Sequence, residues 1–481
     1  MPAHRLAIAV LLGAGPVRSA AAQGSPSIAF VHATVIDVER GRALPGMTVV
    51  VEQGRITAVG ADATVPAPRG ARMIDASGKY LTPGLWDMHV HAATPGLDAL
   101  FLPLLVANGI TGVREMFSRL EWVSSAKSRV RGGELVGPRI VGSGHILDGR
   151  PAVWQGSVVA ATADEAARAV DSLARGGADF IKVYSRLSPE AFFAAAREAK
   201  ARGLPFAGHV PALVSAAEAS DSGQRSVEHL TGIPLGCSTV ERQALGDLAA
   251  AVHSPAGWDS AGRLQRAGLR VLLAAYSPER CRELAARFVR NGTWMVPTIQ
   301  VLHSVAYLDD PALAKDPRME YIFPGHRASW DPKTDFRFRM LTRDDWANRK
   351  ALYARQLEII TLLHREGVKF LAGTDLSNPF IYPGFSLHDE LAALVQAGFT
   401  PAEALRAATI DPARYLGAAD SLGSIATGKR ADLVLLEADP LADIRNTTRI
   451  AAVVADGRFY DSAAIRKLLD DGKARARAAK P

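Results

Sequence analysis

Cysteine is nearly absent from this chain of 481 residues, which contains only Cys237 and Cys281. Neither residue belongs to a Cys-x-x-Cys motif, so the usual signature of a thiolate zinc site or a dithiol redox centre is missing. In an oxidising compartment the two cysteines can form one disulfide, and the alternative is a pair of buried, unreactive thiols.

Long apolar runs and dense basic stripes are also missing after the first residues. No later apolar run approaches the roughly 20 residues that a membrane helix needs. Aromatic residues make up 7% of the chain, and they do not interleave with a Lys/Arg stripe, so nucleic-acid binding is unsupported. With 48% hydrophobic and 22% charged residues, we expect a soluble globular protein with one large and one smaller domain.

The first 22 residues have the pattern of an export signal. Arg5 precedes a short apolar core at 6–14, and three alanines at 20–22 form a small-residue cleavage site. A membrane anchor is the alternative, but the apolar core is too short to span a bilayer. We therefore expect a mature protein that is periplasmic or secreted and has no membrane association.

Both ends of the remaining chain are rich in short β-branched runs. Residues 48–60 predict a hairpin that turns at Gln53-Gly54, and residues 450–460 predict another that turns at Asp456-Gly457. Residues 423–436 add a further strand. These patterns predict one small β-sandwich domain that is assembled from both termini.

The middle of the chain alternates apolar strands with helices. Capping signals at Thr162 and Thr400 and the pair Ser188-Pro189 each predict a helix start. Eight strands are predicted, at 84–91, 110–116, 139–145, 180–184, 205–210, 226–230, 294–299 and 369–375. This alternation predicts a (β/α)8 TIM-type barrel. An open doubly wound sheet is the alternative, but no Gly-rich phosphate loop follows a strand.

The predicted domain boundaries follow from these patterns. Residues 303–345 are long, Pro-punctuated and rich in aromatics, which is typical of a functional insertion, so we expect a lid or substrate wall there. The predicted segments are a signal peptide (1–22), two parts of the β domain (23–80 and 413–462), the barrel (81–412) and a basic C-terminal tail (463–481). The end of this tail, from Lys473 to Lys480, is expected to be solvated.

Six candidate metal ligands stand at the ends of five predicted strands, where barrel enzymes place their chemistry. They are His89, His91, Lys182, His209, His229 and Asp375. His89 and His91 lie two residues apart, so on a strand they point to the same side. Each residue alone is weakly informative, because a lone histidine is often structural and Asp375 could be a helix cap. Together they indicate a metal centre.

These motifs resemble the amidohydrolase superfamily over nearly the whole span from Phe30 to Tyr460. Pro83-Gly-Leu-Trp-Asp-Met-His-Val-His91 is similar to its first metal motif, and Gly428-Lys-Arg-Ala-Asp432 is similar to its C-terminal β signature. Glu228-His-Leu-Thr-Gly232 and Gly373-Thr-Asp-Leu376 are similar to the imidazolonepropionase-like and prolidase-like branch.

The resemblance implies two divalent metal ions, with zinc expected from the imidazole and carboxylate ligands. His89, His91 and Asp375 would bind the more buried ion, and His209 and His229 would bind the second. Lys182 would bridge both ions as an N-carboxylated lysine. A metal-bridging hydroxide would attack the substrate, and Asp375 would act as general base and then as general acid.

Three further residues are candidates for substrate contact. The resemblance places a substrate-holding histidine near His145, although a loop histidine bonded to the backbone is an equal alternative. Tyr184 shares the side of its strand with Lys182. Arg186 could hold a substrate carboxylate through two hydrogen bonds.

The expected activity is hydrolysis of a C–N bond in a small-molecule amide, such as a dipeptide or an N-acyl amino acid. A cyclic-amide hydrolase or a lactone or ester hydrolase is the alternative within the same superfamily. A secreted binding protein on an inactive scaffold is a third possibility, because fold does not determine function. The resemblance also implies a homo-oligomer.

Overall fold

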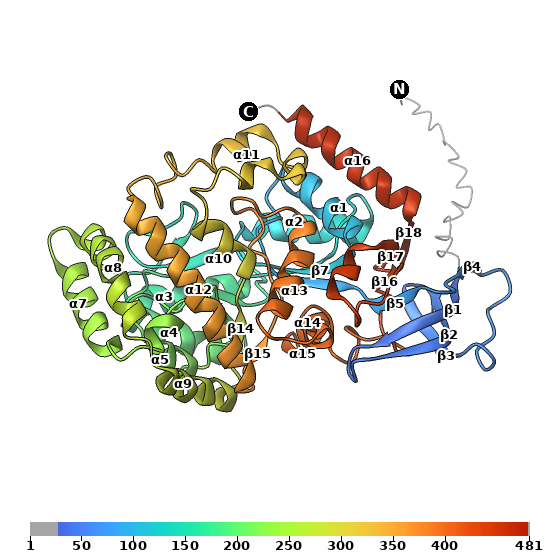
Figure 1. Ribbon diagram of the computed structural model, residues 1–481, viewed down its shortest axis with the longest axis horizontal. Coiled ribbons are helices and arrows are strands. Elements are labelled where there is room, and N and C mark those ends of the chain that lie inside the picture. The colour runs from blue at the N-terminus through green and yellow to red at the C-terminus, as the bar shows by residue number, and fades with distance from the viewer. Residues whose placement is uncertain (1–26, 480–481) are drawn as a thin grey trace, which may run out of the picture.

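The computed structural model describes residues 27–479, so the predicted signal peptide at 1–22 lies outside the described residues. The fold is mixed α/β, as predicted, with many parallel strands and helices packed around them (Figure 1). Within residues 27–479, no helix is both long and apolar enough to cross a membrane.

One eight-stranded sheet draws strands from both ends of the chain. Its order is β18-β17-β16-β5-β1-β2-β3, with β4 paired to β1. The strands are β1 (Ile28–Asp37), β2 (Arg42–Glu52), β3 (Arg55–Ala61), β4 (Arg72–Asp75), β5 (Tyr80–Pro83), β16 (Leu433–Leu436), β17 (Ile450–Ala455) and β18 (Arg458–Asp461). The contact between N-terminal β5 and C-terminal β16 is antiparallel. Segments from the two ends of the chain thus share one sheet, on the right side of Figure 1.

The two predicted hairpin turns of this sheet lie against each other. Gln53 and Gly54 both have positive φ, as do Asp456 and Gly457. A Cβ atom added to Gly457 would lie 2.4 Å from the Cα atom of Gly54. Glycine is therefore required at this approach because any side chain would push the turns apart.

The other strands are parallel to their neighbours and form two sheets. Their orders are β6-β7-β8 and β10-β9-β11-β12-β13-β14-β15. The strands are β6 (Leu85–Val90), β7 (Ile110–Glu115), β8 (Arg139–Gly142), β9 (Ile146–Asp148), β10 (Val158–Val159), β11 (Ile181–Val183), β12 (Phe206–Gly208), β13 (Ser226–Glu228), β14 (Trp294–Val296) and β15 (Lys369–Phe370). Most are shorter than the sequence predicts, because several predicted residues lie in the loops that follow the paired segments.

Helices cover these strands, and the predicted starts are confirmed. Thr162, Ser188 and Thr400 are N-caps whose side chains accept a backbone hydrogen bond. The helices are α1 (Asp98–Ala107), α2 (Leu120–Gly132), α3 (Ala163–Arg175), α4 (Pro189–Ala201), α5 (Ala216–Asp221), α6 (Ile233–Gly236), α7 (Glu241–His253), α8 (Gly257–Ala274), α9 (Pro278–Asn291), α10 (Ile299–Ala306), α11 (Pro324–Ala328), α12 (Arg343–Arg365), α13 (Phe385–Gln396), α14 (Pro401–Ala407), α15 (Ile410–Tyr415) and α16 (Ser462–Ala478).

The predicted basic tail at 463–481, with a solvated end from Lys473 to Lys480, differs from the structure, which has α16 over most of that segment. Ile465, Gly472 and Ala476 are buried on one side of this helix. A Cβ atom on Gly472 would lie 2.6 Å from Leu104, so α16 packs tightly on α1. Most of the basic residues face outward. Because they dominate the composition of this segment, the composition alone does not indicate the apolar stripe. Lys473 pairs with Glu320 at 2.7 Å.

The segment 303–345 contains short helical turns rather than a long helix. They are η1 (Leu313–Lys315), η2 (Pro317–Tyr321) and α11. Arg337 donates a hydrogen bond to Asn378 Oδ1 at 3.1 Å, close in sequence to Asp375. Its guanidinium also lies over the ring of Trp154. The segment therefore packs against loops that follow the parallel strands.

Cys237 and Cys281 are joined by a disulfide. Cys237 follows α6, and Cys281 lies in the first turns of α9. The bond encloses α7 and α8, which project at the left of Figure 1. It thus links the two ends of this helical hairpin.

Candidate metal centre

The predicted ligands all lie at or just after the carboxyl ends of parallel strands. His89 and His91 come from the end of β6, and Lys182 lies within β11. His209, His229 and Asp375 follow β12, β13 and β15. Because carboxyl ends of parallel strands meet at one edge, residues far apart in the sequence are brought together there.

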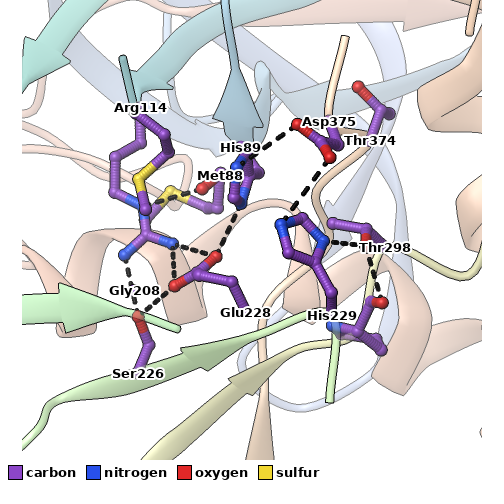
Figure 2. A network of polar contacts seen from close by, with 12 residues as sticks. Met88, His89, Arg114, Gly208, Ser226, Glu228, His229, Thr298, Thr374 and Asp375 are labelled. Atoms are coloured by element: carbon purple, nitrogen blue, oxygen red, sulfur yellow. Dashed lines mark hydrogen bonds and ion pairs between the residues drawn. The ribbon is translucent and has the colours of Figure 1, made fainter. Parts of the chain in front are cut away.

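Three of these residues form a tight cluster. One ligand atom from each of His89, His229 and Asp375 lies within 4.8 Å of the others. Asp375 Oδ1 is 3.4 Å from His89 Nε2, and Asp375 Oδ2 is 3.6 Å from His229 Nε2 (Figure 2). The carboxylate thus lies between two imidazoles that come from different strands.

His91 joins this cluster from the other side of the carboxylate. Its Nε2 atom is 2.9 Å from Asp375 Oδ1, and its Nδ1 atom is 3.8 Å from Glu115 Oε1. The buried Glu115 also accepts hydrogen bonds from the backbone of Ala92 and Ala93. Glu115 therefore holds the loop that positions His91.

Lys182 and His209 lie beside the cluster. The His209 and His229 ring centroids are 5.1 Å apart. His209 Nδ1 forms a hydrogen bond with Ser185 Oγ at 2.8 Å. The His209 ring also packs against the Tyr184 ring, with the two centroids 4.0 Å apart. Lys182 is buried, and within residues 27–479 its ammonium forms no ion pair with a carboxylate.

The backbone is strained at the two loop ligands. Asp375 has φ +60° and His229 has φ +56°, a region that non-glycine residues rarely adopt. The Asp375 amide donates to His89 O at 2.8 Å, which ties the loop after β15 to β6. Residues with such unfavourable backbone angles are common at active sites and ligand sites, where the surrounding structure holds them in place.

Burial and neighbouring charges leave the cluster ready to bind a cation. Burial lowers the pKa of His229 to about 4 and the pKa of His89 well below its usual range. Burial alone would raise the pKa of Asp375, but the attraction of His229, His91 and Lys182 outweighs it and lowers that pKa to about 2. At neutral pH the site therefore contains an ionised carboxylate beside the neutral imidazoles of His89 and His229. His91 differs, because burial would lower its pKa but the carboxylates of Asp375 and Glu115 outweigh burial and raise that pKa to about 9, so a metal ion bound by His91 would displace its proton.

His89 is oriented by a buried charge network that Figure 2 shows. Its Nδ1 atom donates to Glu228 Oε2 at 2.8 Å, which leaves the Nε2 lone pair directed at Asp375. Arg114 donates to both Glu228 oxygens, at 2.8 and 2.9 Å, and to Met88 O at 2.7 Å. A carboxylate that accepts a hydrogen bond from one ring nitrogen of a histidine fixes the tautomer of the ring and raises the basicity of the other nitrogen as a metal ligand.

His229 has its own support. Thr298 Oγ1 lies 2.6 Å from His229 Nδ1, so the Nε2 atom of this ring also faces the cluster. Asp87 accepts hydrogen bonds from the hydroxyl and amide of Thr374, beside Asp375. The side chains of His89 and His229 are thus each held by a second residue that does not itself belong to the cluster.

The atoms present fit a divalent metal ion. His89 Nε2 and Asp375 Oδ1 are buried, lie 3.4 Å apart and have no hydrogen-bond partner of normal geometry in the described part of the chain. Buried polar atoms are normally paired, so unpaired atoms that converge are a reason to infer a ligand. Imidazole nitrogens with a carboxylate oxygen suit zinc and other first-row metals.

The three predicted substrate contacts have different surroundings. His145 Nδ1 bonds to the backbone oxygen of Gly156 at 2.9 Å, which corresponds to the structural alternative for this residue. Tyr184 accepts a hydrogen bond from Trp154 Nε1 and stacks on His209. Arg186 donates to Pro151 O and lies over the ring of Trp258.

The supporting residues Arg114, Glu115 and Glu228 were given no role from the sequence. A signal was available, since Arg114-Glu115 is a charged pair at the end of an apolar strand. Glu228 is the first residue of the motif Glu228-His-Leu-Thr-Gly232. Their partners could not be predicted, because Arg114 and Glu228 belong to different strands.

Arg114→Met should destabilise the fold, because it leaves the fully buried Glu228 carboxylate without its main partner. We expect a loss of about 3–5 kcal/mol in the free energy of unfolding. Urea denaturation measures this loss, and Arg445→Met is the control because its pair with Asp443 is exposed to solvent and should contribute little to the free energy of unfolding. Equal losses for both variants would contradict the structural role of Arg114.

A cavity of about 750 Å³ opens beside the cluster. Its wall includes His229, Ser185 and Arg186 at one end and residues of α7 and α8 along its length. This volume is within the range of small-molecule sites.

Known proteins share both sequence and fold with this chain. Residues 340–460 match the family described as the Amidohydrolase family. Imidazolonepropionase from Pseudomonas putida (strain GB-1) is 27% identical over 436 residues, which cover 86% of this chain and 93% of that protein. For the adenine deaminases and dihydroorotase that match over shorter stretches, the chain spans only 12–16% of their length.

Two solved structures illustrate the similarity of fold. A bottromycin amidohydrolase superimposes with a TM-score of 0.72 at 26% identity, over 94% of this chain and 90% of that one. A Xaa-Pro dipeptidase with bound methionine superimposes with a TM-score of 0.65 at 19% identity, over 91% and 100% of the two chains. The second likeness concerns the fold alone.

Proposed function

Because this chain belongs to the amidohydrolase superfamily, we propose that it is a metal-dependent hydrolase of C–N bonds that acts on dipeptides or N-acyl amino acids. The observation that carries the proposal is the convergence of His89, His229 and Asp375, whose ligand atoms lie within 4.8 Å of one another. The imidazolonepropionase-like and prolidase-like branch is the part of the superfamily that it resembles most in its motifs.

We infer that the parallel strands close into a (β/α)8 barrel. Backbone hydrogen bonds support this, since Met88 in β6 donates to Ala372 after β15, and Asp179 before β11 donates to Gly142 in β8. These bonds link the ends of the two parallel sheets. The composite sheet of the two termini would then be the separate small β domain.

The proposed centre holds two divalent metal ions, with zinc expected. His89, His91 and Asp375 would bind one ion, and His209 and His229 would bind the other. Lys182 would bridge them as a carbamate, and its burial without an ion pair supports this role, because an amine that is neutral can react with carbon dioxide. Burial lowers the pKa of Lys182 to about 8, which increases that neutral fraction.

Bound metal ions would polarise the scissile carbonyl and lower the pKa of the attacking water. Asp375 is placed to accept the proton of that water, since its carboxylate lies between His89, His91 and His229. The same carboxyl group can then donate the proton to the leaving nitrogen. General acid–base catalysis of this kind contributes about 10²–10⁴-fold in rate.

A cyclic-amide substrate is the second candidate, because the imidazolonepropionase from Pseudomonas putida matches over 93% of its length. Lactone or ester hydrolysis would use the same groups. An inactive binding protein would have no need of unpaired ligand atoms at the cluster. Export to the periplasm or medium and a homo-oligomeric state are further proposals.

The test is hydrolysis of a library of dipeptides, N-acyl amino acids and cyclic amides by the purified protein, with and without a chelator. We expect turnover of linear amides that chelation abolishes and added zinc restores. Turnover of cyclic amides alone would favour the second candidate. Turnover that survives complete metal removal would refute the proposed chemistry.

A further inference from the structure

The α7–α8 hairpin has an apolar face that the rest of the described chain does not cover. Leu248 is the only buried residue of α7, and Ala261 is the only one of α8. Val271 is 59% exposed and Leu264 is 38% exposed, although both are large and apolar. An uncovered apolar surface of this kind usually marks a binding site.

The apolar residues of α8 lie along one side of the helix. Trp258, Leu269 and Leu272 are spaced by eleven and three residues, which places them on one face. All three line the cavity beside the metal centre. From Trp258 to Leu272 the helix rises about 21 Å, so the lined surface is elongated.

This cavity is continuous with the reaction site. His229, one of the clustered ligands, forms part of its wall, together with Ser185, which bonds to His209. A molecule in the cavity would therefore reach the reacting centre at one end and the α7–α8 hairpin at the other. A small-molecule substrate meets this condition directly.

We propose that the cavity binds a medium to long unbranched acyl chain of the substrate, with the scissile carbonyl at the His229 end. The assignment rests on the proposed hydrolase function and narrows it to N-acyl amino acids with lipid-like acyl groups. A dipeptide would fill only part of a cavity of about 750 Å³. An extended chain would instead cover the apolar face of α8 along its length.

The charge near the inner end suits the product of this reaction. Arg186 lines the cavity, and its guanidinium lies 5.2 Å from the ring centroid of Trp258. Hydrolysis of an acyl amide releases a fatty carboxylate, whose charge Arg186 would stabilise. Free fatty acids should therefore bind in the cavity even without turnover.

Calorimetric titration with hexanoate, octanoate and decanoate, each below its micelle concentration, tests the assignment on the purified protein. Each buried methylene should strengthen binding by about fourfold, so decanoate should bind about 200-fold more tightly than hexanoate. Leu269→Trp fills the cavity and should weaken decanoate binding by at least about tenfold. Equal affinities for the three acids would overturn the assignment.

Arg263→Trp is the matched control, because Arg263 is exposed and does not belong to the cavity wall, so the introduced tryptophan adds the same bulk outside the cavity. It should leave decanoate binding unchanged. Leu264→Trp is a second cavity variant should Leu269→Trp not fold, since Leu264 is already partly exposed. Loss of binding in the control as well would also overturn the assignment.

Hydrolysis of N-acetylglycine and N-decanoylglycine separates this inference from the proposed function. Faster cleavage of the decanoyl compound supports both. Binding of decanoate without cleavage of any amide would refute the hydrolase and leave the cavity assignment in place. Equal cleavage of both amides with no decanoate binding would refute the cavity assignment alone.

Discussion

Asp375→Asn should lower kcat by about 10⁴-fold, at the upper end of the range for general acid–base catalysis. Asparagine has almost the same shape as aspartate, but it has no negative charge and cannot accept the proton of the attacking water. The effect should be large because Asp375 is also within 3.6 Å of three imidazole nitrogens, and its charge helps to hold the cation. Steady-state kinetics with the best amide substrate measures the change.

The fold should survive this substitution, because the Asp375 backbone amide still donates to His89 O. Circular dichroism and thermal unfolding check this point. Asp443→Asn is the control, since Asp443 pairs with Arg445 at the surface and should leave kcat unchanged. A fall of less than about tenfold for Asp375→Asn would show that another group moves the proton.

Lys182→Ala should remove bound metal and lower kcat/KM by about 10³–10⁴-fold. Bound metal ions would stabilise the transition state by several kcal/mol, and this stabilisation is lost when the metal is lost. The side chain is buried next to His209 and His229 and forms no ion pair in the described residues. The alanine leaves a small hole that acetate or propionate could fill. Either acid should restore part of the metal content and part of the activity.

Lys182→Arg is the informative companion variant. It keeps the positive charge, but guanidinium stays protonated and cannot form a carbamate. It should therefore also lose metal, without rescue by acetate. Lys127→Ala, which removes a partly exposed ion pair with Asp179, is the control for general effects on the protein. Normal metal content in Lys182→Ala would eliminate the bridging role.

The location of the metal centre could be predicted from sequence because its residues mark strand ends. His89 and His91 follow an apolar strand, and His209, His229 and Asp375 each follow another. Parallel strands bring such ends to one edge, so spacing and order alone indicated a cluster. The structure brings these residues together, while their assignment to two separate ions rests on the family resemblance.

The supporting network could not be predicted in the same way. Arg114 and Glu228 are 114 residues apart, and nothing local indicates that they pair. The helix α16 was missed because two of its three buried residues, Gly472 and Ala476, are small and most of its basic residues are exposed. The α7–α8 hairpin has an apolar face with no partner among residues 27–479, and a sequence pattern cannot distinguish such a face from one that packs in a core.

Metal analysis of the purified protein tests the central claim most directly. After dialysis against zinc and removal of the excess, inductively coupled plasma mass spectrometry should find about two equivalents of divalent metal per chain, and His89→Ala should reduce that number. Wild-type protein that binds no stoichiometric metal under these conditions would contradict the account, whatever activity it shows.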